Sequence, residues 1–302
     1  MKISASYLIF EGGLEGTKPI AQAMKEAKIL GFEAIELAIA SQGVLTHRAS
    51  RSQCEDIVAA AQKIGIEISG LASGEHWTCS PTANQPGVRK KIIDFVCQAL
   101  QVAKWLGTDA YLFVPGAVDV FFLPDAEVIP YDICYERASE AVRRILPAAH
   151  ETGVTLCIEN VWNKFLLSPL EMRDFIDSFD SPALGSRQAG SPAGVNLPPQ
   201  ERGFVGAYFD VGNVLLTGYP DHWIRILGQR IKRVHVKDFK RSVGTVEGFV
   251  DLLEGDVDFE AVKKALADIG YDSYVTAELL PFQPGRPEKT AQAMKKIFKS
   301  RK

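Results

Sequence analysis

Four β-rich segments in the second half of the chain each carry a side chain that can bind a metal ion. These side chains are Glu159 in "CIENVW", Asp210 in "YFDVGN", His235 in "RVHVKDF" and Glu278 in "VTAELL". Each lies in or follows a run of apolar or small residues, where a lone buried charge would be costly. Three carboxylates that converge with an imidazole repel one another unless a cation lies among them. The four residues therefore predict a site for a divalent ion.

The ligand types narrow the choice of ion. Oxygen and nitrogen ligands without a thiolate suit Mn2+, Mg2+ or Co2+, and Zn2+ is a weaker candidate. Taken singly, each residue has an ordinary structural explanation. A histidine in a strand is often a hydrogen-bonded core residue, and a carboxylate can cap the following helix. The repetition of such residues on consecutive strands is what favours metal binding.

The segment around His235 also predicts how its side chains are directed. Arg233, His235 and Lys237 alternate with Val234 and Val236. Alternate residues of a strand point to opposite faces. We therefore expect the valines to pack against helices and the polar residues to face the inside of the protein.

Short β-rich runs alternate with longer helical patterns along the whole chain. Strands are expected at residues 2–8, 32–38, 65–72, 109–115, 154–161, 205–211, 231–237 and 273–279. Helices are expected at residues 19–31, 50–65, 87–107, 135–153, 168–179, 220–230, 259–270 and 287–300. Eight such pairs in about 300 residues are typical of an α/β protein with one (β/α)8, or TIM, barrel. The rival is a doubly wound sheet, but the first strand–helix turn lacks the G-x-G-x-x-G pattern.

The segment 182–203, "PALGSRQAGSPAGVNLPPQERG", does not fit this alternation. It is rich in Gly, Pro, Ser and Gln, and such a long connection is unusual in a compact domain. Because it joins a helix to the next strand, a barrel would place it on the N-terminal face, away from the catalytic end. We interpret it as an exposed, flexible insertion in one domain that spans residues 1–302.

Composition sets the protein class. The chain has 302 residues, of which 46% are hydrophobic, and its net charge of −3 gives no general attraction to nucleic acid or anionic membranes. The five cysteines form no C-x-x-C pair, which favours a reduced compartment. The N-terminal apolar run is too short for a signal peptide, and no run is long enough to span a bilayer. We expect a cytoplasmic protein without a membrane or nucleic-acid partner.

Further polar and aromatic residues are candidates for holding a substrate. The candidates are Glu36 and His76 at the second and third strand ends, Trp77, Trp162, and Lys237, which shares the parity of His235. For each of them a structural hydrogen bond or core packing is an equally good explanation. Asp238, Lys240 and Arg241 follow in the seventh loop, which often helps to bind phosphate in barrels, although a solvated run of charges is the simpler interpretation.

The motifs "YFDVGNV", "RVHVKD" and "LLEGDVDFEAVKKAL" resemble the xylose-isomerase-like barrel superfamily of sugar isomerases and epimerases. The resemblance covers nearly the whole chain apart from 182–203 and is strongest to the pentulose-5-phosphate 3-epimerase and D-tagatose 3-epimerase branch. It implies that Glu159, Asp210, His235 and Glu278 are the metal ligands. It also implies that Glu159 and Glu278 are the acid/base pair.

The implied reaction is the epimerisation or isomerisation of a ketose through an enediolate. One glutamate removes the proton next to the carbonyl and the other returns one from the opposite face. The partner is then a small sugar or sugar phosphate, within carbohydrate metabolism, and homo-oligomers are common in this superfamily.

Two positions, both predicted to bind the substrate by resemblance, give opposite indications about phosphorylation of the sugar and leave it open. Asn213 stands where tagatose epimerases carry a histidine, and the phosphate-sugar branch shares this asparagine. Arg241 lies where the tagatose-type enzymes place a substrate-binding arginine.

Three alternatives remain open for the function. They are an inosose-type dehydratase on the same metal site, a catalytically silent sugar-binding protein and, least favoured, an endonuclease IV-like DNA-repair enzyme. The last needs a histidine-rich site and a basic face, which five histidines and a negative net charge do not supply.

Overall fold

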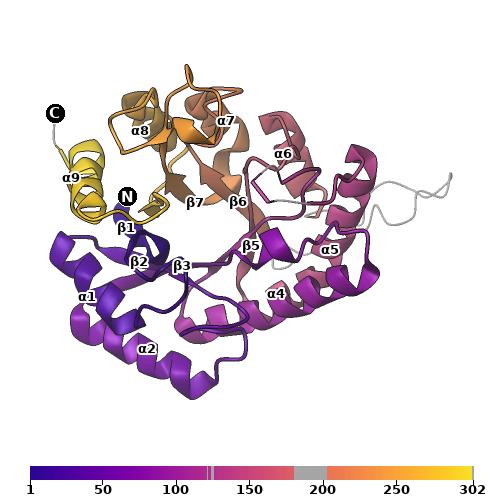
Figure 1. Ribbon diagram of the computed structural model, residues 1–302, viewed down its shortest axis with the longest axis horizontal. Helices are drawn as coiled ribbons and strands as arrows, with labels where there is room; N and C mark the ends of the chain where they lie inside the picture. Colours follow the sequence, from indigo (N-terminus) through magenta and orange to yellow (C-terminus); the bar gives the residue numbers. More distant parts are fainter. Residues whose placement is uncertain (121, 124–125, 180–202, 301–302) are drawn as a thin grey trace.

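The computed structural model describes residues 1–120, 122–123, 126–179 and 203–300, and within them eight parallel strands close into a barrel (Figure 1). The strands are β1 (Lys2–Ser6), β2 (Ala34–Ala38), β3 (Glu67–Ala72), β4 (Ala110–Phe113), β5 (Thr155–Glu159), β6 (Val205–Asp210), β7 (Ile231–Val236) and β10 (Tyr274–Ala277). Each strand pairs with its neighbours in the chain-order ring, and β10 closes it against β1. The predicted TIM barrel is confirmed.

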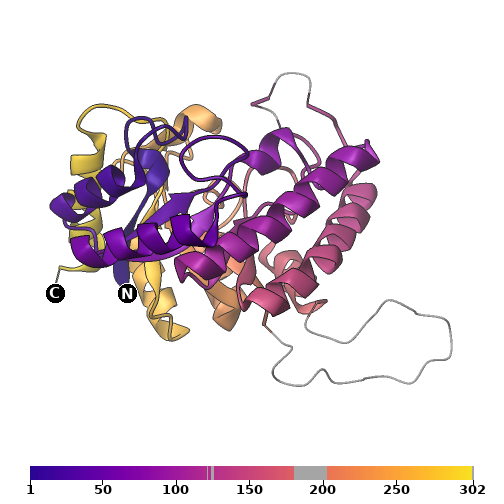
Figure 2. The same ribbon diagram turned by 90° about the horizontal axis from the view of Figure 1, so that it is seen from below.

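Helices surround the barrel on its outside, as Figures 1 and 2 show. They are α1 (Ile20–Leu30), α2 (Arg51–Ile64), α3 (Glu75–Thr78), α4 (Pro86–Leu106), α5 (Tyr131–Thr152), α6 (Pro169–Asp177), α7 (Pro220–Leu227), α8 (Phe259–Asp268) and α9 (Arg286–Phe298). The short α3 follows β3 and was not predicted. The predicted start of α5 at 135 was too late, because that helix begins at Tyr131 after Pro130.

The ends of several helices agree with the glycine signals in the sequence. α1, α2, α4 and α5 stop immediately before Gly31, Gly65, Gly107 and Gly153, each with a left-handed backbone. A residue without a Cβ adopts this conformation at no steric cost and ends the helix there. The predicted insertion, 182–203, lies outside the described residues except for Gly203, so its flexibility and position stay predictions.

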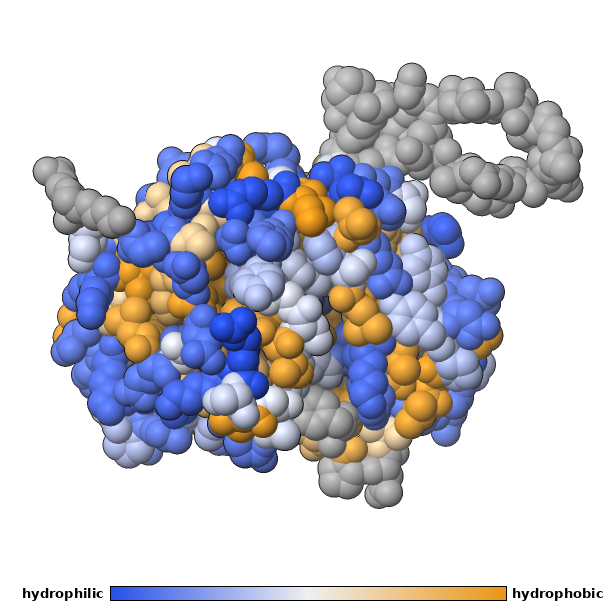
Figure 3. Space-filling model, turned by 90° about the horizontal axis from the view of Figure 1, so that it is seen from above, coloured by the Kyte–Doolittle hydropathy of each residue, from blue (hydrophilic) through white to orange (hydrophobic). Residues whose placement is uncertain are grey.

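Two compositional expectations can be compared with the structure. The five cysteines are all unpaired. None of the helices in the described ranges combines the length and the apolar character needed to cross a bilayer. The face in Figure 3 is covered mainly by hydrophilic residues, with apolar residues in separate groups.

Strand β7 divides its side chains between two packing regions, as the alternation predicted. Val234 and Val236 are fully buried in the large apolar core between barrel and helices. Arg233 points into the barrel instead, where its Nε donates to the Ser69 carbonyl and its guanidinium contacts Asp109. His235 lies one step nearer the C-terminal end, with its side chain completely buried. The barrel interior therefore holds polar residues at several levels.

The loop after β7 contains structure that the sequence did not reveal. Asp238–Phe239 (β8) pairs antiparallel with Phe249–Val250 (β9), and a 3-10 turn at Val246–Gly248 precedes β9. Asp238 is 1% exposed, so its interpretation as a solvated charge was wrong. Its carboxylate accepts the backbone N–H groups of Phe239, Leu253, Gly255 and Val257. This one side chain ties both ends of the loop together.

We expect Asp238→Asn to destabilise the protein by about 1–3 kcal/mol, because an amide nitrogen facing backbone N–H groups leaves donors unpaired in a buried site. Urea unfolding of the variant measures this loss. The matched control is Asp56→Asn on the exposed surface of α2, which should leave the unfolding free energy unchanged. Equal stability of the two variants would show that Asp238 does not anchor the loop.

Candidate metal centre and substrate cavity

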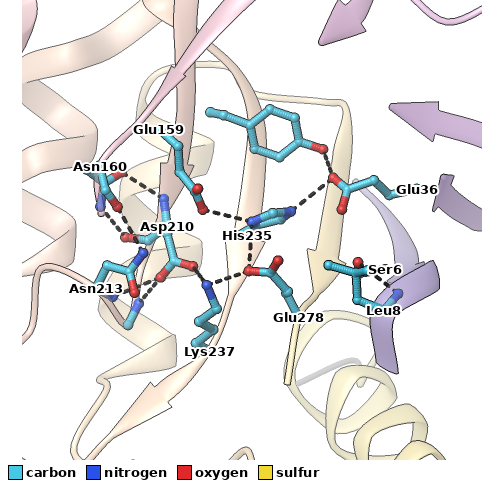
Figure 4. Close-up of polar contacts among 12 residues, drawn as sticks. Ser6, Leu8, Glu36, Glu159, Asn160, Asp210, Asn213, His235, Lys237 and Glu278 are labelled. Atoms are coloured by element: carbon cyan, nitrogen blue, oxygen red, sulfur yellow. Dashed lines mark hydrogen bonds and ion pairs between the residues drawn. The ribbon is translucent and has the colours of Figure 1, made fainter. Parts of the chain in front are cut away.

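The ends of four barrel strands bring the predicted ligands together. Glu159 and Asp210 are the last residues of β5 and β6, His235 lies in β7, and Glu278 directly follows β10. Ladder pairing sets His235 beside Asp210 on one side and beside Thr276 on the other. One ligand atom from each of the four residues lies within 4.8 Å of the others, and all four residues are buried. Figure 4 shows these side chains directed toward one another.

Positive and negative groups alternate within this cluster. His235 Nδ1 lies 3.0 Å from Glu159 Oε1 and 3.3 Å from Glu278 Oε2. The Lys237 ammonium lies 2.8 Å from Asp210 Oδ2 and also contacts Glu278 Oε2. Lys237 therefore lies beside the four predicted ligands and bridges two of their carboxylates (Figure 4).

Asp210 is held with one oxygen directed at the cluster. Its Oδ1 accepts the backbone N–H groups of Gly212 and Asn213, each at 2.8 Å. The Asn160 side chain fixes the backbone on either side, since its Nδ2 donates to the Asp210 carbonyl and its Oδ1 accepts the Asp210 N–H. Asp210 Oδ2 accepts no further hydrogen bond among the described residues beyond its ion pair with the Lys237 ammonium at 2.8 Å. This anionic oxygen therefore already faces positive charge, as the oxygen of a metal ligand would.

Glu36 lies behind the imidazole and outside the lining of the cavity described below. It is fully buried in β2, and its Oε2 lies 2.9 Å from His235 Nε2. The Tyr208 hydroxyl donates to the same oxygen. Such a carboxylate fixes the tautomer and ring orientation of a histidine ligand, so that Nδ1 faces the other carboxylates. Sequence reasoning missed Tyr208, although it precedes Asp210 by two residues and so shares its face of β6.

The charges of the cluster shift its pKa values in opposite directions. Burial raises the pKa of Glu159 to about 7. Burial would also raise the pKa of Glu278, but the nearby Lys237 and His235 charges hold it well below its usual range. Burial would lower the pKa of His235, yet Glu36 and Glu278 raise it well above its ordinary value. The site thus stabilises positive charge strongly, which fits a divalent ion bound by these carboxylates and this imidazole.

A cavity of about 660 Å3 opens beside the cluster. Of the four predicted ligands, only Glu159 and Glu278 line it, and they are 7% and 9% exposed. Asp210 and His235 are completely buried behind them. The two glutamates can therefore touch a molecule in the cavity, while the other two ligands can act only from beneath.

The remaining predicted substrate residues separate into two groups. Trp162, Asn213, Lys237 and Trp77 line the cavity. Trp162 is fixed there, because its Nε1 donates to the Asn213 carbonyl and its ring packs against Phe239 and Phe249.

His76 and Arg241 do not line the cavity in this structure. His76 is buried against Phe113, its Nε2 lies 3.4 Å from the Tyr111 hydroxyl, and burial lowers its pKa to about 4. The exposed Arg241 side chain lies over the Tyr219 ring. A direct substrate contact for either residue, or for Glu36, therefore has no support in the geometry.

Solved structures that resemble this chain in shape include sugar epimerases and an epimerase-like protein. A D-tagatose 3-epimerase-like protein has 18% identity and a TM-score of 0.73, with 99% of this chain and 97% of that chain covered. A D-psicose 3-epimerase from Clostridium cellulolyticum H10 has 17% identity and a TM-score of 0.71, with 98% of each chain covered. A 3-keto-D-glucoside 4-epimerase from E. coli has 14% identity and a TM-score of 0.73, with 99% of this chain and 100% of that chain covered. At these identities the likeness establishes the fold.

Sequence comparison gives the family. No curated protein sequence matches the chain. The family model described as xylose isomerase-like TIM barrel matches residues 24–186 and 199–300, which is most of the chain. Together with the closed barrel, this match shows that the chain belongs to the xylose isomerase-like TIM barrel family.

Proposed function

We propose that this protein is a metal-dependent sugar epimerase or isomerase that moves a proton next to the carbonyl of a ketose. One observation carries the proposal: of the clustered ligands, the two glutamates alone reach the cavity. A pair of carboxylates at the floor of a cavity is what proton removal and return require. The epimerases among the structural neighbours are consistent with this chemistry.

Glu159, Asp210, His235 and Glu278 would hold the ion, which is Mn2+, Mg2+ or Co2+ by ligand type. A bound divalent ion would polarise the substrate carbonyl and offset the negative charge that develops on its oxygen. Glu36 is a positioning residue in this scheme. It accepts a hydrogen bond from His235 Nε2 and so directs Nδ1 toward Glu159 and Glu278, where that atom would serve as a ligand.

Glu159 and Glu278 are the proposed acid/base pair. They come from β5 and from the end of β10, and each contacts His235 Nδ1. One glutamate removes the proton from the carbon beside the carbonyl and leaves an enediolate. The other donates a proton to the opposite face of the same carbon, which inverts it. Return of the proton to the neighbouring carbon by one glutamate would give isomerisation instead.

Lys237 supports the same pair electrostatically. Its ammonium contacts Glu278 Oε2 and lines the cavity, so it keeps this carboxylate ionised. Lys237 is also placed to donate a hydrogen bond to a substrate oxygen at the cavity floor. Asn213 also lines the cavity, with its carbonyl accepting a hydrogen bond from the Trp162 indole.

We expect the purified protein to bind one divalent ion per chain, measured by elemental analysis and by calorimetric titration of the chelator-treated protein with Mn2+. Asp210→Asn should abolish this binding, because it removes the anionic oxygen aimed at the cluster. The exposed Asp56→Asn variant should bind normally. Equal Mn2+ affinity of Asp210→Asn and the wild type would contradict the proposed ligand set.

Glu36→Gln should weaken Mn2+ binding by about tenfold to a hundredfold without changing the stoichiometry, since an amide orients the imidazole less well and raises its basicity less. The same titration measures the effect. Glu67→Gln, on the exposed N-terminal end of β3, is the control. An unchanged affinity in Glu36→Gln would remove the positioning role.

Glu278→Gln should retain the fold but lose proton–deuterium exchange at the carbon beside the carbonyl of its ketose, because an amide cannot accept the proton. Nuclear magnetic resonance of a panel of ketoses and their phosphates in deuterated water measures the exchange. Near-normal exchange in the variant would disprove the two-glutamate scheme. The wild-type protein distinguishes the alternative functions in the same experiment. If it removes water from the sugar instead of exchanging the proton, it is a dehydratase. If it binds the metal but catalyses neither reaction, it is a silent sugar-binding protein.

A further inference from the structure

The walls of the cavity differ in character from its floor. Glu159, Lys237 and Glu278 gather at the floor beside the metal ligands. Most of the remaining lining is apolar, and its largest aromatic members are Trp77, Phe122, Trp162 and Phe249. The cavity thus offers charge at one end and an apolar surface along its length.

The rim of the cavity is apolar as well. Leu14, Phe122, Val246 and Leu280 line the cavity and are also 56%, 46%, 44% and 38% exposed. They come from the loops after β1, β4, β7 and β10, so they surround the opening from separate sides. Exposed apolar residues that converge on one opening mark a binding site more often than chance.

The polar groups on the walls are largely engaged within the protein. Both oxygens of Asp238 accept backbone N–H groups, and the Ser73 hydroxyl accepts the Glu75 N–H. Asn213 donates its amide to the Asn160 carbonyl. Hydroxyl groups of a sugar therefore find few partners on the walls, whereas the floor offers the glutamates and Lys237.

The described lining is also poorly suited to a phosphate. Its cations are Lys237 and Arg286. Lys237 contacts two carboxylates, and Arg286 donates to Asp251 Oδ1 at 2.8 Å and to the Pro281 carbonyl. The wall also carries the acidic Glu247. The basic residues of the seventh loop, Lys240 and Arg241, lie outside the lining.

The size of the cavity leads to the same conclusion. A volume of about 660 Å3 falls within the range of roughly 300–1,000 Å3 that usually encloses drug-sized ligands. A free hexose, with about a dozen non-hydrogen atoms, would fill the floor and leave the apolar walls in contact with water, which costs free energy in proportion to their area.

We propose that the substrate is a neutral sugar that carries an apolar substituent, such as a keto-glycoside with an aromatic or alkyl aglycone. The sugar ring lies on the floor against Glu159 and Glu278, and the substituent extends along the apolar walls to the rim. This assignment of substrate class rests on the function proposed above. It also predicts tighter binding of a sugar with an apolar substituent, which can be measured without turnover.

The test is calorimetric titration of the metal-loaded protein with methyl β-D-glucoside, 4-nitrophenyl β-D-glucoside and glucose 6-phosphate. These probes measure recognition without turnover. We expect the nitrophenyl compound to bind about tenfold or more tightly than the methyl compound, because the ring is removed from water. The phosphate should bind more weakly than both. Equal affinity of the two glucosides, or preference for the phosphate, would overturn the proposal.

A matched pair of variants tests whether the apolar cavity wall causes the preference for the nitrophenyl group. Val246→Asp places a charge on the cavity wall, and Val243→Asp places one on an equally exposed residue of the same loop outside the lining, at 44% and 43% exposure. Val246→Asp should lose the preference for the nitrophenyl group, while Val243→Asp should keep it. If neither variant changes the preference and Val246→Asp instead dissociates an oligomer, the rim is a subunit contact and the proposal fails.

Exchange on methyl and 4-nitrophenyl 3-keto-β-D-glucosides separates this proposal from the function on which it rests. Faster exchange on the aryl compound supports both. Tighter aryl binding without exchange on any ketose supports the substrate class and contradicts the epimerase. Exchange that is faster on free or phosphorylated ketoses supports the epimerase and contradicts the apolar substituent.

Discussion

The fold and the site both depend on how negative charge is compensated around His235. Four carboxylates, Glu36, Glu159, Asp210 and Glu278, lie in the barrel interior within reach of one imidazole and one ammonium. Ionised carboxylates without partners would be expelled from such an environment or would become protonated. The hydrogen bonds and ion pairs that hold them are strong because the surroundings are buried. A cation is therefore the group this cluster fits best.

Polar residues at successive levels of the barrel interior make different contacts. Near the N-terminal end, Arg233 contacts Asp109 and the Ser69 carbonyl and acts structurally. At the middle level, His235 is held by Glu36 and directed at the other carboxylates. Near the C-terminal end, Lys237 meets the cavity. Arg233 and His235 belong to β7 and Lys237 directly follows it, so the three residues alternate along one stretch of chain whose inner face points into the barrel.

Chemistry and recognition are carried by different parts of the molecule. Strand ends position the two glutamates, whereas loops contribute much of the cavity wall. In the loop after β7, Asp238 holds both ends through four backbone hydrogen bonds, and the pairing of Phe239 with Phe249 places the latter along the wall. Such a loop can change its apolar surface without disturbing the proposed metal ligands, because Asp238 and those four residues are separate side chains.

Local sequence signals were enough to predict the order of strands and helices and the four residues that cluster, because periodicity and strand-end residues can be recognised within short segments. Glycine stops and the alternation around His235 were readable for the same reason. The sequence by itself could not assign Glu36 to His235, reveal Tyr208 as its partner or show that Asp238 is buried, since each depends on residues far apart in the chain. Only the closed barrel decided which glutamates reach the cavity. The exposure of each glutamate to the cavity depends on how strand ends and loops pack together, so it cannot be predicted from any single segment.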